Sequence, residues 1–276
     1  MMCAWKELLA ILPQWLRREV ELPGKDELKE LRLRINSPPE LVLGKSSRWL
    51  DRNASEEDIA FCVNAASRYS PWSASTMSQG YITGLGGHRL GLCGEAVCRN
   101  GEVTGLRSIH SICIRIARDF PGISASAELG GSVLILGAPG WGKTTLLRDL
   151  IRRISETSCV AVIDERGELF PQGFLRGKRM DILTGCPKPA GMDMVLRAMG
   201  PEWIAVDEIT AQGDCDALVQ AVGCGVKLLA TAHAASLEEF RCRPIYQKIW
   251  DMRIFQTFLI LHKDQTFHRE RMGQWN

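Results

Sequence analysis

The sequence lacks an apolar run long enough to cross a bilayer, which takes about 20 residues. Residues 1–20 come closest, but Pro13 interrupts the run, Arg17 and Arg18 end it, and no small-residue cleavage site follows. This pattern predicts an amphipathic helix rather than a signal peptide or a membrane anchor. We therefore expect a cytoplasmic protein with no transmembrane segment, peripheral at a membrane through a partner.

The sequence also lacks a large excess of either charge. It has 34 Lys and Arg against 32 Asp and Glu, which gives a net charge of +2. A strongly basic surface for nucleic acid and a polybasic membrane anchor are therefore disfavoured, while a local basic patch stays open. Nucleic acid is accordingly not an expected partner.

Paired cysteine spacings are missing as well. The ten Cys residues are scattered, no two form a C-x-x-C pair, and most stand in apolar strings, where they resemble small hydrophobic residues. A zinc site built from Cys and a disulfide framework are both disfavoured. The cysteines thus fit a reduced, cytosolic setting.

The length of 276 residues favours two domains. The first part mixes alternating strings such as "ELRLRI" with the Gly-rich, hairpin-like segment "GYITGLGGHRLGLCGEAVCRNGEV". Pro, Gly and Ser accumulate at residues 118–131, which indicates a linker. We expect a smaller α+β domain over residues 1–122 and a second domain over residues 123–276.

In the second predicted domain, continuous apolar strings alternate with helical stretches. Such strings predict a mainly parallel sheet with helices on both faces, because strands buried on both sides have no polar face. A final segment, 254–271, is interpreted as one or two antiparallel strands at the edge of the sheet. The four central strings are 132–137, 159–164, 203–208 and 227–233.

The segment "GAPGWGKT" fits the pattern G-x-x-x-x-G-K-[ST], with the strand "VLIL" before it and the helix "TTLLRDLIRRI" after it. This context predicts a nucleotide-binding P-loop and hence an α/β fold with a RecA-like sheet. Lys143 would neutralise the β- and γ-phosphates and Thr144 would bind Mg²⁺, so the expected cofactors are ATP and Mg²⁺. The predicted nucleotide-binding residues are Gly137, Ala138, Pro139, Gly140, Trp141, Gly142, Lys143, Thr144 and Thr145.

Hydrolysis requires further acidic groups, and two of the buried strings end in them. "WIAVDE" ends in Asp207, a predicted Mg²⁺ ligand, and Glu208, a predicted catalytic base or water-positioning group. "AVIDERGEL" offers Asp164 as a further metal ligand and Glu165 as a catalytic carboxylate. Two simpler interpretations stay open: the first pair could cap the next helix, and the second could be neutralised by Arg166.

The segment "LLATAHAASLEEF" places His233 directly after the fourth apolar string. A lone histidine is more often a core-edge residue held by a backbone hydrogen bond. As the fourth strand-end element after Lys143, Glu165 and Glu208, however, it is expected at the same edge of the sheet. There it would contact the γ-phosphate or the catalytic carboxylate, with Thr231 as its helper.

These four elements, "GAPGWGKTT", "VIDERGEL", "VLRAMGPEWIAVDEI" and "TAHA", occur in an order that resembles the type II/type IV secretion ATPase superfamily. Its motor domain carries a Walker A loop, an acidic box, a Walker B segment written roughly L-R-x-x-P-D-x-I-x-x-x-E-I, and a histidine box T-x-H. The chain fits this Walker B pattern with one residue added between Arg and Pro. The matching residues are Leu196, Arg197, Pro201, Glu202, Ile204, Glu208 and Ile209.

Within that superfamily, "LRLRINSPPELVLG", "SICIRIARD" and "GKTTLLRDL" are similar to signatures of the stage III sporulation AA family of endospore-forming bacteria. The resemblance implies an ATPase that assembles into a homo-oligomeric ring, a hexamer, and energises a channel between mother cell and forespore. It also implies membrane proteins of that channel as partners and the mother-cell cytoplasm as the location.

The resemblance further implies that arginines of the N-terminal domain reach the γ-phosphate, and Arg89 and Arg115 are the candidates. Ordinary surface ion pairs explain either arginine equally well. The chain also departs from the larger secretion ATPases. Asp207 stands where they have Gly, Thr210 stands where they have Arg, and the tetracysteine module of some members is missing.

Together these features predict a Mg²⁺-dependent ATP hydrolase that works as a ring-forming motor. One alternative is an ATP-driven nucleic-acid motor of the helicase or translocase kind, which the balanced charge and the lack of an aromatic-rich basic strip disfavour. The other is a nucleotide-gated scaffold with little turnover, and replacement of Glu208 by Gln separates the two, because assembly should survive in a scaffold and phosphate release should vanish in a motor.

Overall fold

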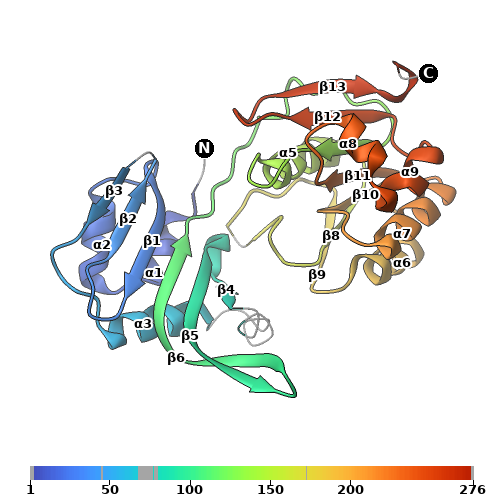
Figure 1. Cartoon of the computed structure of the whole chain (residues 1–276). Helices are drawn as coiled ribbons and strands as arrows, with labels where there is room; N and C mark the ends of the chain where they lie inside the picture. Colours follow the sequence, from blue (N-terminus) through green and yellow to red (C-terminus); the bar gives the residue numbers. More distant parts are fainter. Residues whose placement is uncertain (1–2, 45, 68–76, 78–79, 172, 275–276) are drawn as a thin grey trace. The chain divides into compact units, whose positions relative to one another are not determined.

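The computed structural model describes residues 3–44, 46–67, 77, 80–171 and 173–274 (Figure 1). The chain forms two compact units. The first comprises Met1–Asp119 together with Pro171–Phe174, and the second comprises Phe120–Phe170 together with Leu175–Asn276. Across the described ranges, no helix is both long and apolar enough to cross a membrane.

The first unit is built on an antiparallel sheet. Within the described residues its six strands lie in the order β3-β2-β1-β6-β5-β4. Asn100 and Gly101 join β5 to β6 with positive φ angles of 53° and 82°, as a two-residue hairpin turn requires. The elements are α1 (Trp5–Ala10), α2 (Gln14–Glu21), β1 (Leu28–Arg34), β2 (Glu40–Leu43), β3 (Ser46–Trp49), α3 (Glu56–Ser67), β4 (Tyr81–Thr83), the 3₁₀ helix η1 (Leu85–Gly87), β5 (Arg89–Arg99) and β6 (Glu102–Arg115).

Alternation along β1 gives this unit its core. Leu31 and Leu33 are buried, while the arginines between and after them point to the opposite face, as period-two patterning predicts. The helices contribute Leu8, Leu16 and Ile59 to the same apolar cluster. The first unit therefore has a hydrophobic core of its own.

The second unit is the predicted mainly parallel sheet. In the part of it that the structure describes, seven strands lie in the order β13-β12-β7-β11-β10-β8-β9, and all neighbours are parallel except β12 and β13. The elements are β7 (Val133–Leu136), α5 (Lys143–Ser155), β8 (Val160–Asp164), β9 (Met180–Thr184), α6 (Lys188–Ala198), β10 (Trp203–Val206), α7 (Gln212–Gly223), β11 (Lys227–Ala232), α8 (Leu237–Cys242), η2 (Pro244–Tyr246), α9 (Gln247–Asp251), β12 (Thr257–Leu261), β13 (Phe267–Arg271) and η3 (Met272–Gln274).

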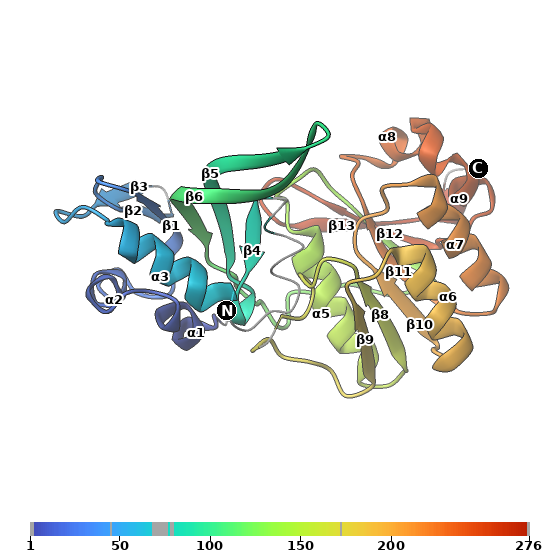
Figure 2. The same cartoon turned by 90° about the horizontal axis from the view of Figure 1, so that it is seen from below.

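Helices cover both faces of this sheet (Figure 2). One face packs on α5, where Ile135, Val162 and Leu147 belong to one apolar cluster. The other face packs on α6 to α9, where Leu136 and Ile163 belong to a second cluster. The four predicted strings thus form the central strands β7, β8, β10 and β11, buried on both sides, and the α/β fold class is confirmed.

One strand of this sheet was not predicted from the sequence, and the structure narrows the prediction for the terminal segment to one antiparallel edge strand. The edge strand β9 was not expected, because "MDILT" is short and its side chains are mostly half-exposed or exposed. Of the two terminal strands, only β13 is antiparallel. The crossover through α8 and α9 returns β12 to the sheet parallel to β7.

Candidate functional site

The loop at residues 137–142 joins β7 to α5 at the carboxyl edge of the parallel strands. Gly140 and Gly142 have φ angles of +79° and +98°, a region that strains other residues, and a Cβ added to either would meet no atom within 4 Å. At Gly137 a Cβ would lie 3.1 Å from Cβ of Leu261, so this glycine allows a close approach. The start of α5 offers N–H groups without intrahelical partners and a positive dipole end, which suit a phosphate.

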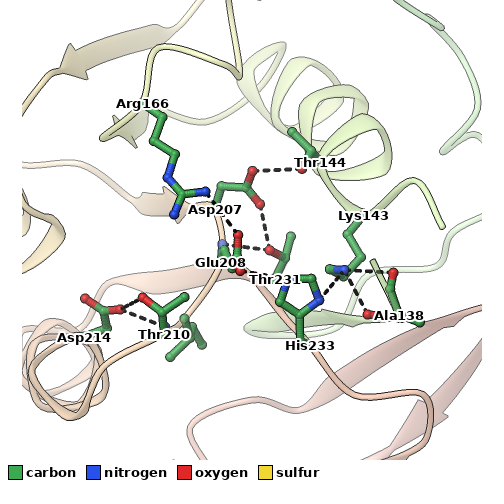
Figure 3. Close-up of polar contacts among 12 residues, drawn as sticks. Ala138, Lys143, Thr144, Arg166, Asp207, Glu208, Thr210, Asp214, Thr231 and His233 are labelled. Carbon is green, nitrogen blue, oxygen red and sulfur yellow. Dashed lines mark hydrogen bonds and ion pairs between the residues drawn. The ribbon is translucent and has the colours of Figure 1, made fainter. Parts of the chain in front are cut away.

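Lys143 begins α5, and its side chain is buried. Its Nζ donates to the carbonyl oxygens of Gly137 (2.8 Å) and Ala138 (3.1 Å) and lies 3.0 Å from Nδ1 of His233 (Figure 3). Among the described residues, no carboxylate lies within ion-pair distance of Nζ. Burial lowers the pKa of Lys143, and two nearby carboxylates oppose this effect. A buried cation with neutral direct partners favours an incoming anion.

The contacts of His233 assign its tautomer. The ammonium of Lys143 can only donate, so Nδ1 of His233 accepts its hydrogen bond. Nε2 therefore carries the ring proton and donates it to Oε1 of Glu208 at 2.7 Å. A neutral imidazole thus connects the loop lysine to the strand-end glutamate through two hydrogen bonds.

Thr231 holds the turn that carries Asp207 and Glu208. Its buried hydroxyl accepts the N–H of Glu208 (2.8 Å) and donates to Oδ1 of Asp207 (2.7 Å). Glu208 has a φ of 51°, a left-handed conformation that costs a residue other than glycine about 1–2 kcal/mol. The hydroxyl of Thr231 therefore stabilises a turn that Glu208 alone would not favour.

Thr144 and Asp207 bring two oxygen ligands together. Thr144 Oγ1 donates to Asp207 Oδ2 at 2.9 Å, and adjacent ligands at about 2.1 Å from an octahedral Mg²⁺ are about 3.0 Å apart. These two oxygens thus have a spacing that fits Mg²⁺. The described ranges contain no group of three or more His, Cys, Asp or Glu side chains placed to hold a metal. In nucleotide sites, Mg²⁺ usually takes one or two protein ligands and adds phosphate and water.

Asp164 organises the loop that follows β8. It is buried, and its two carboxylate oxygens accept the N–H groups of Glu168 and Leu169, both at 2.9 Å. Burial raises the pKa of Asp164, and these backbone hydrogen bonds oppose the rise. The contacts give Asp164 a role in ordering the loop, and its assignment as a metal ligand stays a prediction.

The neighbours of Asp164 form other ion pairs than the simple sequence interpretation suggests. Arg166 contacts Glu208, with Nη1 3.6 Å from Oε2. Glu165 pairs with Lys188, whose Nζ lies 2.7 Å from Oε2 of Glu165. Sequence reasoning missed Lys188, because "CPKPAG" matches none of the motifs that it considered.

Most of the acidic side chains described above line one pocket at the carboxyl edge of the parallel strands. Thr144 joins it to the phosphate loop through Asp207, and His233 joins it to Lys143 through Glu208. The structure therefore connects side chains from all four predicted strand-end elements. The pocket is lined by Asp164, Glu165, Arg166, Glu168, Lys188, Asp207 and Glu208.

The two predicted arginines lie in the first unit. Arg89 and Arg115 are directly opposite each other in the β5 and β6 ladder. The guanidinium of Arg89 stacks 3.9 Å from the ring centroid of Tyr81, and Nε of Arg115 lies 3.4 Å from Oε1 of Glu30. Their contact with a γ-phosphate stays a prediction.

Comparisons with known proteins agree with this architecture. The family model described as sporulation stage III, protein AA matches residues 4–271. The chain is 36% identical to stage III sporulation protein AA of Bacillus subtilis (strain 168), over 93% of this chain and 91% of that protein.

Two solved structures share the fold. The chain resembles the ATPase DotB of Legionella pneumophila with a TM-score of 0.59 at 18% identity, over 94% of this chain and 80% of that one. It also resembles the ADP-bound pilus retraction motor PilT, with a TM-score of 0.63 at 14% identity. This match covers 94% of this chain and 78% of that one.

Replacement of Thr231 by Val tests the role of its hydroxyl. The substitution removes the donor to Asp207 and leaves the partly buried N–H of Glu208 without its acceptor. We expect the free energy of unfolding to fall by about 1–3 kcal/mol. Thr231→Ser keeps the hydroxyl and should retain most of this contribution. Urea unfolding followed by circular dichroism measures both, and equal losses in the two variants would contradict the assignment.

Proposed function

The chain belongs to the sporulation stage III protein AA family, and from this premise we propose that it is a Mg²⁺-dependent ATP hydrolase. The observation that carries the proposal is the connection from Lys143 through His233 to Glu208. It links a lysine suited to phosphate with a carboxylate suited to positioning or deprotonating water. The likeness to two proteins named as an ATPase and as a retraction motor supports it at the level of the fold.

Each residue has a role in this proposal. The loop N–H groups and Lys143 bind and neutralise the β- and γ-phosphates. Thr144 and Asp207 hold Mg²⁺, which when bound neutralises charge on the phosphate oxygens. Glu208 orients the attacking water and accepts its proton at a carboxylate oxygen, and Glu165 assists from the same pocket.

His233 couples the occupancy of the loop to Glu208. Without nucleotide, Lys143 donates to Nδ1 of His233, and Nε2–H fixes the carboxylate of Glu208. A phosphate that draws Lys143 away removes the donor at Nδ1, and this changes the group that orients Glu208. Hydrolysis would thereby respond to whether the phosphate site is filled.

The motor function is the wider part of the proposal. We propose a homo-oligomeric, hexameric ring in the mother-cell cytoplasm that acts on membrane proteins of a channel to the forespore. Closure of the N-terminal unit over the nucleotide would be the mechanical step, with Arg89 and Arg115 as γ-phosphate contacts. Family membership and the fold supply the support for these statements.

Glu208→Gln tests the hydrolytic step. Gln keeps the size of the side chain and the acceptor for His233 but cannot take a proton from water. We expect ATP affinity within a few-fold of the wild type and turnover lower by about 10²–10⁴-fold. Phosphate release and binding of a fluorescent ATP analogue measure the two quantities. Equal turnover in variant and wild type would exclude Glu208 as the base, and a wild type without turnover would favour a scaffold.

His233→Ala separates coupling from binding. Loss of the imidazole leaves Lys143 free for phosphate but removes the hydrogen bond that Nε2 donates to Oε1 of Glu208, so we expect nucleotide affinity within a few-fold and a sharp fall in kcat. The matched control is His262→Ala, because His262 lies at the exposed β12–β13 hairpin, where it contacts His268. If His233→Ala unfolds the chain, or changes kcat no more than the control does, His233 has only a structural role.

A further inference from the structure

Lys188 occupies a place where a cation is unfavourable. It is the first residue of α6, after the N-cap Pro187, and its side chain is only 9% exposed. The N-terminal end of a helix carries partial positive charge, which repels a cation. Burial of an ammonium adds a desolvation cost. Lys188 is thus unfavourable both for its helix position and for its burial. Residues of this kind are expected at functional sites, where their partners compensate the lost stability.

Two carboxylates compensate the charge of Lys188. Its Nζ lies 2.7 Å from Oε2 of Glu165 and 3.7 Å from Oδ2 of Asp214. Asp214 already caps α7, since the same oxygen accepts the N–H groups of Thr210 (2.9 Å) and Ala211 (3.1 Å). Asp214 is thus already held by the backbone, whereas Glu165, the partner at the shorter distance from Nζ, depends on Lys188.

Glu165 is the partner that needs to be held. Its side chain is 39% exposed and follows the last residue of β8, so its backbone position alone does not fix the carboxylate. Both Glu165 and Glu208 line the pocket, and the segment that Asp214 caps begins two residues after Glu208. Lys188 thus connects the loop after β8 to the loop after β10.

We propose that Lys188 is a positioning residue that holds the carboxylate of Glu165 in the pocket beside Glu208. The inference rests on the proposed hydrolase function, in which Glu165 assists Glu208. A role in holding Glu165 also accounts for the burial of Lys188, because a buried ammonium has fewer conformations than a surface one and holds a partly exposed carboxylate more firmly. Lys188 acts through Glu165 and does not itself contact the reacting atoms.

Lys188→Met tests this role with the fold preserved. Methionine fills a similar volume and favours a helix, and Asp214 keeps its backbone donors, so circular dichroism should show an intact fold; Lys188→Gln serves as the second variant. We expect kcat to fall on the order of 100-fold, as for a misplaced catalytic group, with KM within a few-fold. Lys188→Arg should recover part of kcat.

The control is Lys178→Met. Lys178 also forms a 2.7 Å ion pair, with Glu156, but both side chains are exposed, and neither lines the pocket. This variant should leave kcat unchanged. In a Glu165→Gln background, Lys188→Met should cause no further loss, because the group it positions is already gone. A further loss of similar size would overturn the proposal, since Lys188 would then act independently of Glu165.

A second measurement needs no turnover. In the nucleotide-free protein, acetylation of lysine amines by N-hydroxysuccinimidyl acetate is followed by mass spectrometry. Glu165→Gln should raise the labelling of Lys188 several-fold and leave that of Lys178 unchanged; unchanged labelling of Lys188 would overturn the contact. If the wild type releases no phosphate, the proposed function fails, and the labelling still decides whether Lys188 holds Glu165.

Discussion

The ammonium group of Lys143 is buried, and its direct contacts are two carbonyl oxygens of its own loop and one imidazole nitrogen. A charge in such a place is costly unless an anion compensates it. The carbonyl dipoles and His233 hold it where a phosphate would arrive. The tautomer of His233 and its hydrogen bond to Glu208 follow from this arrangement.

The rest of the site keeps acidic groups close to that lysine without neutralising it. Thr231 bonds to the carboxylate of Asp207 and to the backbone N–H of Glu208, so it fixes the Asp207 side chain and the turn that carries Glu208. The carboxylate oxygens of Asp164 accept hydrogen bonds from the loop after β8, and this loop places Glu165 in the pocket. The parallel register of β7, β11, β10 and β8 brings these strand ends to one edge.

The phosphate loop and the central strands could be predicted because their determinants are local. Gly140 and Gly142 are required by backbone angles within the loop, and a strand buried on both faces has to be continuously apolar. The partners of Glu165 and Arg166 could not be predicted, since they depend on which loops the sheet register brings together. Arg166 directly follows Glu165 in the sequence, yet its ion pair is with Glu208. Glu165 instead pairs with Lys188, which lies 23 positions further along the chain.

The most direct test of the account is the ¹⁵N NMR spectrum of the His233 ring, without nucleotide and with Mg²⁺ and a non-hydrolysable ATP analogue. Without nucleotide, the spectrum should show a protonated Nε2 and an unprotonated, hydrogen-bonded Nδ1, because Lys143 donates to Nδ1. The analogue should shift the Nδ1 resonance as Lys143 moves to the phosphate. A ring protonated at both nitrogens without nucleotide, or an Nδ1 resonance that saturating analogue leaves unchanged, would contradict the account.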